Sequence, residues 1–116
     1  MPFSAVAANV RDHQVVELRG ELDISTAPYL MHELGTVLGL ARQPRVVMDA
    51  SELTFMDSMG MRAILDFHRG VKACGGQLAL VGPTQHVQRV LRVTGVDRYL
   101  DVFDSVADAV ESWQQG

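Results

Sequence analysis

The residues best placed to do chemistry lie in the segment Phe55–Met61, where the hydroxyl of Ser58 directly follows the carboxylate of Asp57. The segment lies between a predicted buried strand and a predicted amphipathic helix, and a helix N-terminus presents unpaired N–H groups and a partial positive charge. A serine at that position can cap the helix, act as a nucleophile or accept a phosphate group. The rest of the sequence helps to discriminate among these three roles.

A nucleophilic serine needs a histidine or another base beside it. The four histidines are scattered: one in a predicted turn, two on the polar sides of predicted helices and one near a helix start (His13, His32, His68 and His86). None is predicted to converge on Ser58, and the flanking residues do not form a Gly-x-Ser-x-Gly elbow. We therefore predict solvated histidines and no enzymatic activity.

The sequence offers little support for a metal or cofactor site. Cys74 is the only cysteine, and the histidines include no pair four residues apart, so the usual ligand spacings are missing. Asp49, Glu52 and Asp57 could gather near one edge of the sheet and hold a divalent ion, although acids near a loop are more often solvated turn residues. No glycine-rich loop of the phosphate-binding kinds is present. The sequence predicts no metal and no cofactor.

Capping and phosphorylation are compatible roles for Ser58. As an N-cap, its oxygen would accept the N–H of Gly60 or Met61 and stabilise the helix by ~1 kcal/mol. A phosphate would add roughly −1.5 to −2 charges, which a helix N-terminus tolerates but the neighbouring Asp57 does not. Phosphorylation would therefore leave the fold intact and spoil a partner surface that flexible methionines form nearby. The candidate methionines are Met56, Met59 and Met61, and at least one of the three is expected to lie in the hydrophobic core instead.

The elements that position Ser58 follow from the apolar pattern. The predicted strands are residues 3–10, 14–19, 45–50, 78–81 and 102–103, and helices follow the second, third, fourth and fifth of them. The order β-β-α-β-α-β-α-β-α predicts an α/β fold, in which a mixed, mostly parallel sheet has its helices packed on one face. Residues 1–116 are expected to form a single domain with no linker or repeat.

Composition and charge disfavour several classes of function. The 116 residues carry a net charge of −4, with a pI near 5.4, which argues against nucleic acids and anionic membrane surfaces as partners. No apolar run is long enough for a transmembrane helix, and the N-terminus lacks the pattern of a secretory signal. Because a single cysteine cannot form an internal disulfide, we expect a cytoplasmic protein.

Several segments, in this order and at these separations, resemble the STAS domain of bacterial anti-sigma-factor antagonists. The matching segments are Gly20–Asp23, Thr26–Pro28, the strand ending at Asp49, Phe55–Gly60, Thr94–Val96, Phe103 and the final helix. The resemblance covers essentially the whole chain. It implies a STAS-like fold and a partner-switching protein that binds an anti-sigma factor and thereby frees a sigma factor for transcription.

The resemblance also implies the partners and the site. The anti-sigma factor would have a histidine-kinase-like ATPase fold and act as a serine kinase on Ser58, and a separate serine phosphatase would restore binding. Asp23 would be the acid beside the phosphorylation site, whereas Met59, Met61 and Arg62 depart from the family pattern. The expected partner-contact residues are Asp23, Ser25, Thr26, Met56, Asp57, Met59, Gly60 and Arg62. The alternative function is an unphosphorylated scaffold or adaptor subunit of a signalling or lipid-transport complex.

Overall fold

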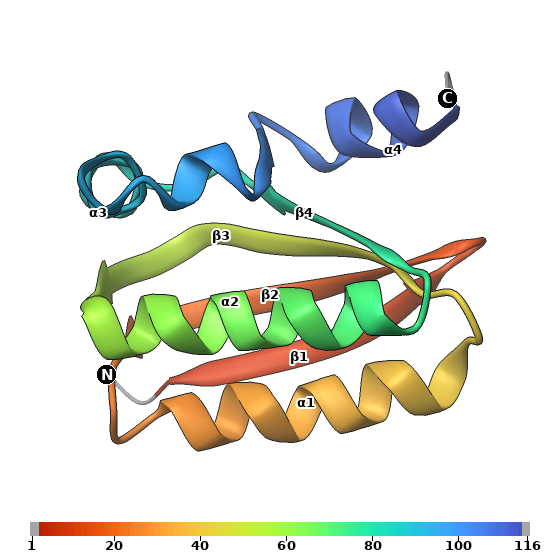
Figure 1. The fold of residues 1–116 in the computed structure, drawn as a ribbon, viewed down its shortest axis with the longest axis horizontal. Coiled ribbons are helices and arrows are strands. Elements are labelled where there is room, and N and C mark those ends of the chain that lie inside the picture. Colours follow the sequence, from red (N-terminus) through yellow and green to blue (C-terminus); the bar gives the residue numbers. More distant parts are fainter. Residues whose placement is uncertain (1–2, 115–116) are drawn as a thin grey trace.

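The computed structural model describes residues 3–114, which form five strands, four α-helices and one 3₁₀ helix (Figure 1). The strands are β1 (Ser4–Val10), β2 (His13–Leu22), β3 (Arg45–Met56), β4 (Gln77–Val81) and β5 (Asp101–Phe103). The helices are α1 (Ala27–Leu40), α2 (Ser58–Ala73), α3 (Gln85–Thr94), η1 (Val96–Arg98) and α4 (Val106–Gln114). The predicted order of strands and helices is confirmed. None of these helices is long and apolar enough to cross a membrane.

The strands form one mixed sheet in the order β1-β2-β3-β4-β5. β1 and β2 are an antiparallel hairpin, and its turn places Arg11 in the left-handed region at φ 57°. β2, β3, β4 and β5 are parallel to one another, as expected for strands that are joined by helical crossovers. The predicted mixed, mostly parallel sheet is therefore confirmed.

Helices cover both faces of the sheet, which corrects the expectation that they all pack on one face. Alternate residues of a strand point to opposite sides, so Val46 and Met48 join the larger core with α1, α2 and α3. Val47 instead joins a smaller core with Ala109 and Trp113 of α4. Within residues 3–114 no parallel strand follows α4, so the handedness rule for crossovers does not place this helix. It packs where apolar side chains of the second face would otherwise meet water.

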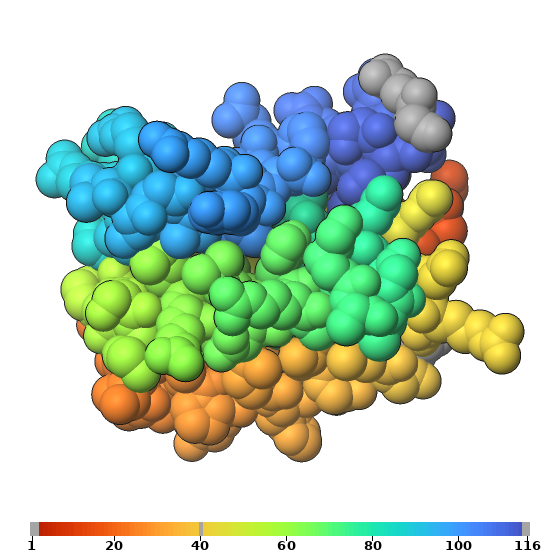
Figure 2. Space-filling model, viewed as in Figure 1, coloured from red at the N-terminus to blue at the C-terminus, as the bar shows by residue number. Residues whose placement is uncertain are grey.

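β3 is longer than the sequence predicts, and its extension positions the candidate site. It continues past the predicted end at Ala50 to Met56. Near this end Leu22 of β2 pairs with Met56 of β3. The loops that follow the two strands therefore leave the same edge of the sheet, and the starts of α1 and α2 lie at the same end of the molecule (Figure 1, Figure 2).

Candidate functional site

The site expected from the sequence lies where the loop after β2 meets the first turn of α2. The backbone N–H of Asp57 donates to the carbonyl oxygen of Leu22 at 3.3 Å. Gly60, in the first turn of α2, has no room for a side chain, since a Cβ atom there would lie 2.2 Å from the Leu22 oxygen. Glycine at this position therefore allows α2 to pack directly against the end of β2.

Asp57, rather than Ser58, is the N-cap of α2. Its backbone is extended (φ −103°, ψ −173°), and its Oδ1 accepts the N–H groups of Met59 at 3.0 Å and Gly60 at 2.9 Å. The expected capping role of Ser58 is therefore wrong, because Ser58 is already the first residue of the helix. Aspartate is a favoured cap, and its charge also interacts well with the positive end of the helix dipole.

The hydroxyl of Ser58 is free for contacts outside the molecule. Ser58 is exposed, and the side-chain hydrogen bonds of residues 3–114 do not include its hydroxyl, whereas those of Asp57 hold the same turn. The backbone around Ser58 is fixed by the cap and by the contact of Gly60 with β2. The hydroxyl is thus presented at a defined place on the surface without taking part in the fold.

Asp23 organises the loop between β2 and α1. Its Oδ1 accepts the N–H of Ser25 at 2.9 Å, the hydroxyl of Ser25 at 2.6 Å and the N–H of Thr26 at 3.2 Å. The Oγ1 atom of Thr26 accepts the N–H of Asp23 at 2.9 Å and donates to the carbonyl of Glu21 at 2.8 Å. The hydrogen bonds to the Asp23 carboxylate, above all that from the Ser25 hydroxyl, lower its pKa. The loop therefore presents an ionised carboxylate at the same edge as Ser58.

Only one of the three candidate methionines lies on the surface. Met56 is 1% exposed because it points from β3 into the core, Met61 is 8% exposed on the inner side of α2, and Met59 is 41% exposed. Met56 is therefore wrong as a partner contact. Gly60 is buried as well and packs against Leu22 instead of presenting surface.

Two exposed apolar side chains beside the site were missed by the sequence reasoning. Ile24 is 69% exposed in the loop after β2, and Phe55 is 38% exposed at the end of β3. An isolated apolar residue inside a predicted loop is the signal that could have found them. The ring of His86, at the start of α3, stacks on Phe55 with centroids 5.2 Å apart, and its Nε2 hydrogen-bonds the Met56 carbonyl at 3.1 Å. The sequence carries no signal for this pairing of His86 with β3.

The remaining expected contacts are distributed over both loops and the first turns of α2. Arg62 is exposed one helical turn after Ser58, and the ion pairs of residues 3–114 do not include it. Three of the expected residues are exposed (Ser25, Met59 and Arg62), and three are half-buried (Asp23, Thr26 and Asp57). The structure thus brings six of the eight residues to the surface of one edge.

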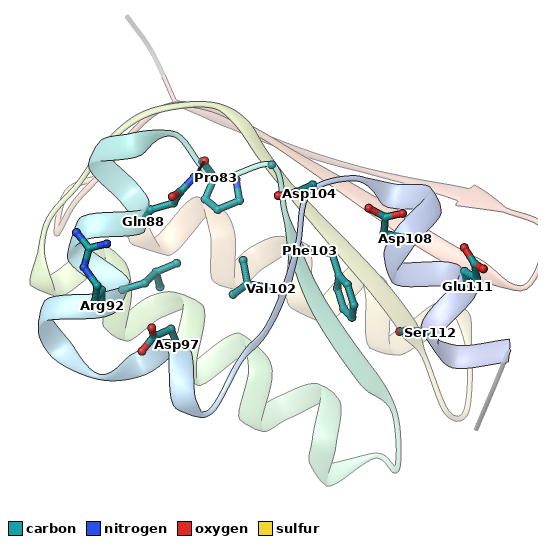
Figure 3. Close-up of a pocket in the computed structure, with 12 residues that line it drawn as sticks. Pro83, Gln88, Arg92, Asp97, Val102, Phe103, Asp104, Asp108, Glu111 and Ser112 are labelled. Carbon is teal, nitrogen blue, oxygen red and sulfur yellow. Dashed lines mark hydrogen bonds between the residues drawn. The ribbon is translucent and has the colours of Figure 1, made fainter.

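Within residues 3–114, no metal site is found at Ser58, and a well-formed hollow lies elsewhere. Asp49, Glu52 and Asp57 do not gather, and the described residues contain no group of three histidine, cysteine or acidic side chains arranged to hold an ion. A hollow of about 660 Å³ lies between α3, β5 and α4 (Figure 3), with Phe103 among its lining residues and none of the expected site residues. This hollow therefore lies apart from the residues expected at the Ser58 edge.

Comparison with known proteins agrees with the family resemblance of the sequence segments. Residues 5–109 match the family model of the STAS domain. A Thermotoga neapolitana protein described as a candidate anti-sigma factor antagonist is 31% identical over 70 residues, which cover 60% of this chain and 62% of that protein. The anti-sigma-B factor antagonist of Bacillus subtilis is 28% identical over 97 residues, which cover 84% of this chain and 86% of that protein. The chain spans only 62% and 59% of the length of the two Thermotoga relatives that it matches.

Solved structures show the same fold. The anti-sigma factor antagonist SpoIIAA in its unphosphorylated form superposes with a TM-score of 0.76 at 22% identity, covering 99% of this chain and 98% of that chain. The phosphorylated form of SpoIIAA from Bacillus superposes with a TM-score of 0.68 at the same identity of 22%, covering 96% and 98% of the two chains. At this identity the likeness establishes the architecture alone.

Proposed function

The chain belongs to the STAS domain family, and we propose that it is an anti-sigma-factor antagonist controlled by phosphorylation of Ser58. In the unphosphorylated state it binds an anti-sigma factor with a histidine-kinase-like ATPase fold, and this binding frees a sigma factor. The anti-sigma factor also phosphorylates Ser58, which abolishes the binding, and a serine phosphatase restores it. The protein acts by binding, in the cytoplasm, and catalyses no reaction of its own.

The observation that carries the proposal is that Asp57, and not Ser58, provides the side chain that stabilises the first turn of α2. The carboxylate of Asp57 caps α2, so a kinase can phosphorylate the exposed Ser58 hydroxyl without breaking a capping hydrogen bond. The proposed role as phosphate acceptor is also favoured over a nucleophilic role. The Nε2 atom of His86 hydrogen-bonds the Met56 carbonyl, and the side-chain hydrogen bonds of residues 3–114 include none from a histidine to Ser58.

The surface around Ser58 explains why a phosphate would prevent binding. Ile24, Phe55 and Met59 expose apolar surface at this edge, and burying such surface against a partner is favourable. A phosphate would place roughly −1.5 to −2 charges beside this apolar surface. Burying a charge in an interface without a counter-charge is strongly unfavourable. The relatives whose names describe anti-sigma factor antagonists support the same partner class for this chain.

A phosphorylation assay tests the site. Each anti-sigma factor with a histidine-kinase-like ATPase fold from the source genome would be purified and incubated with radiolabelled ATP and this protein. We expect one of them to label the wild type and the control Ser51→Ala, whose serine is likewise exposed, but not Ser58→Ala. Label that persists in Ser58→Ala would refute the assignment of the site.

A binding assay separates the proposed function from the scaffold alternative. The variant Ser58→Asp should bind the same anti-sigma factor at least tenfold more weakly than the wild type while its melting temperature changes by only a few degrees. Ser51→Asp adds the same charge at a strand position and should bind like the wild type. A stable complex that tolerates Ser58→Asp would instead favour an unphosphorylated scaffold or adaptor.

A further inference from the structure

A phosphate on Ser58 would enter a turn in which three backbone hydrogen-bond donors are already occupied. The Asp57 carboxylate accepts the N–H groups of Met59 and Gly60, and the Asp57 carbonyl accepts the N–H of Met61 at 2.9 Å. Three of the donors that make a helix N-terminus attractive to phosphate are therefore engaged with Asp57, which is itself negative. A nearby cationic side chain would therefore add compensation for the phosphate charge that these three donors do not supply.

Arg62 is placed to provide that charge. It follows Ser58 by four residues on α2, and side chains with this spacing are neighbours on a helix surface. Helical side chains also lean toward the N-terminus, which directs the guanidinium toward the turn that holds Ser58. An anion followed four residues later by a cation is the more favourable order of such a pair.

The guanidinium of Arg62 forms no ion pair with a carboxylate among the described residues. Arg62 is exposed and belongs to none of the ion pairs within residues 3–114. Asp66, the acid one turn further along α2, is paired with Arg69 at 3.5 Å. Among the described residues, Arg62 is therefore a cation without an ion pair, close to a site that would gain negative charge on phosphorylation.

We propose that Arg62 binds the phosphate of phosphorylated Ser58. The inference rests on the proposed function, because it requires that Ser58 carries a phosphate. The contact joins a planar guanidinium to phosphate oxygens in a charge-assisted hydrogen bond and offsets the repulsion between the phosphate and Asp57. It also withdraws Arg62 from the partner surface, so that phosphorylation changes two features of the interface at once.

The test measures the second pKa of the phosphate by ³¹P NMR, with phosphoserine incorporated genetically at position 58. No kinase is needed, so the experiment stays informative even if no kinase acts on Ser58 and the proposed function fails. Arg62 stabilises the dianion, and for an exposed helical pair its removal should raise the second pKa by about 0.3 units, a roughly twofold change in proton affinity. Arg62→Gln should show this rise. Arg62→Lys keeps the positive charge, so its second phosphate pKa should stay close to that of the wild type. In 0.5 M salt the difference between the wild type and Arg62→Gln should shrink.

The control Arg69→Gln removes the same charge from the same helix, eleven positions beyond Ser58. It should change the phosphate pKa by less than half as much as Arg62→Gln. Equal pKa values in the wild type and Arg62→Gln would overturn the inference while leaving the proposed function standing. Equal shifts in Arg62→Gln and Arg69→Gln would overturn it too, because they would show a general effect of net charge instead of a local contact.

Discussion

Replacing Gly60 with alanine would place a methyl group where the end of β2 packs against α2. The new Cβ atom would lie 2.2 Å from the carbonyl oxygen of Leu22 and 2.8 Å from its carbonyl carbon. Ordinary van der Waals contact begins near 3.4 Å, so the two elements would have to separate by about 1 Å. Both clashing atoms belong to the backbone, and no side-chain rotation can relieve the contact.

The magnitude follows from two destabilising contributions and one stabilising contribution. Overpacking of this kind costs ~1–3 kcal/mol, and the separation would also weaken the hydrogen bond from the Asp57 N–H to the Leu22 carbonyl, which contributes ~1 kcal/mol. The better helix propensity of alanine returns only ~0.5–1 kcal/mol. We therefore expect Gly60→Ala to lower the free energy of unfolding by ~2 kcal/mol, which corresponds to about 8 °C in Tm for a domain of this size.

Gly35→Ala is the matched control for this measurement. Gly35 is also a helical glycine, in the middle of α1, and a Cβ atom there would have no neighbour within 4 Å. Only the propensity effect remains, so this variant should melt about 2–4 °C above the wild type. Thermal unfolding followed by circular dichroism compares the two variants. The packing argument would be refuted if Gly60→Ala melted at or above the temperature of the wild type.

Three further predictions concern the cap and two titrating groups. Asp57→Ala should lower the free energy of unfolding in urea by ~1 kcal/mol and Ser58→Ala by less than ~0.5 kcal/mol; the reverse order would contradict the assignment of the cap. NMR titration should find the pKa of Asp23 below its ordinary value of 3.8, and Ser25→Ala should raise it, because the Ser25 hydroxyl stabilises the carboxylate. That stabilisation is present above pH 3.8 and is lost as the pH falls through the lowered pKa. Burial lowers the pKa of His68 below 6.5, so stability should fall as the pH drops below about 6.5, and an unchanged pH profile in His68→Gln would contradict this.

The general position of the site could be predicted from the sequence because it depends on topology. A helix between two strands implies that the strands are parallel, and parallel strands end at the same edge of the sheet. Asp23 and Asp57 each follow directly after such a strand, and the pairing of Leu22 with Met56 confirms the shared edge. No knowledge of side-chain packing is needed for this step.

The burial of Met56 could not be predicted because the pairing of β2 with β3 is irregular. A regular strand alternates its faces with a period of two, yet the buried residues beyond Ala50 are Leu53 and Met56, three apart. The register shifts twice along this pair, once between Glu17 and Arg19 and once between Gly20 and Glu21, and such irregularities rotate the following side chains. A strict period of two therefore ends the strand too early and leaves Met56 in a loop.

The assignment of the cap failed for a different reason, and the correction bears on the function. Aspartate and serine are both favoured caps. To choose between two adjacent residues, the helix start must be known to within one position, and sequence patterns do not resolve it that finely. If Ser58 were the cap, phosphorylation would esterify the oxygen that holds the first turn and would disturb the helix as well as the surface. Because Asp57 holds that turn, the charge on Ser58 can change while the backbone of the turn keeps its place. Under the proposed function, the partner then responds to a change of surface charge at Ser58 and Arg62 without a change of the fold, as a reversible switch requires.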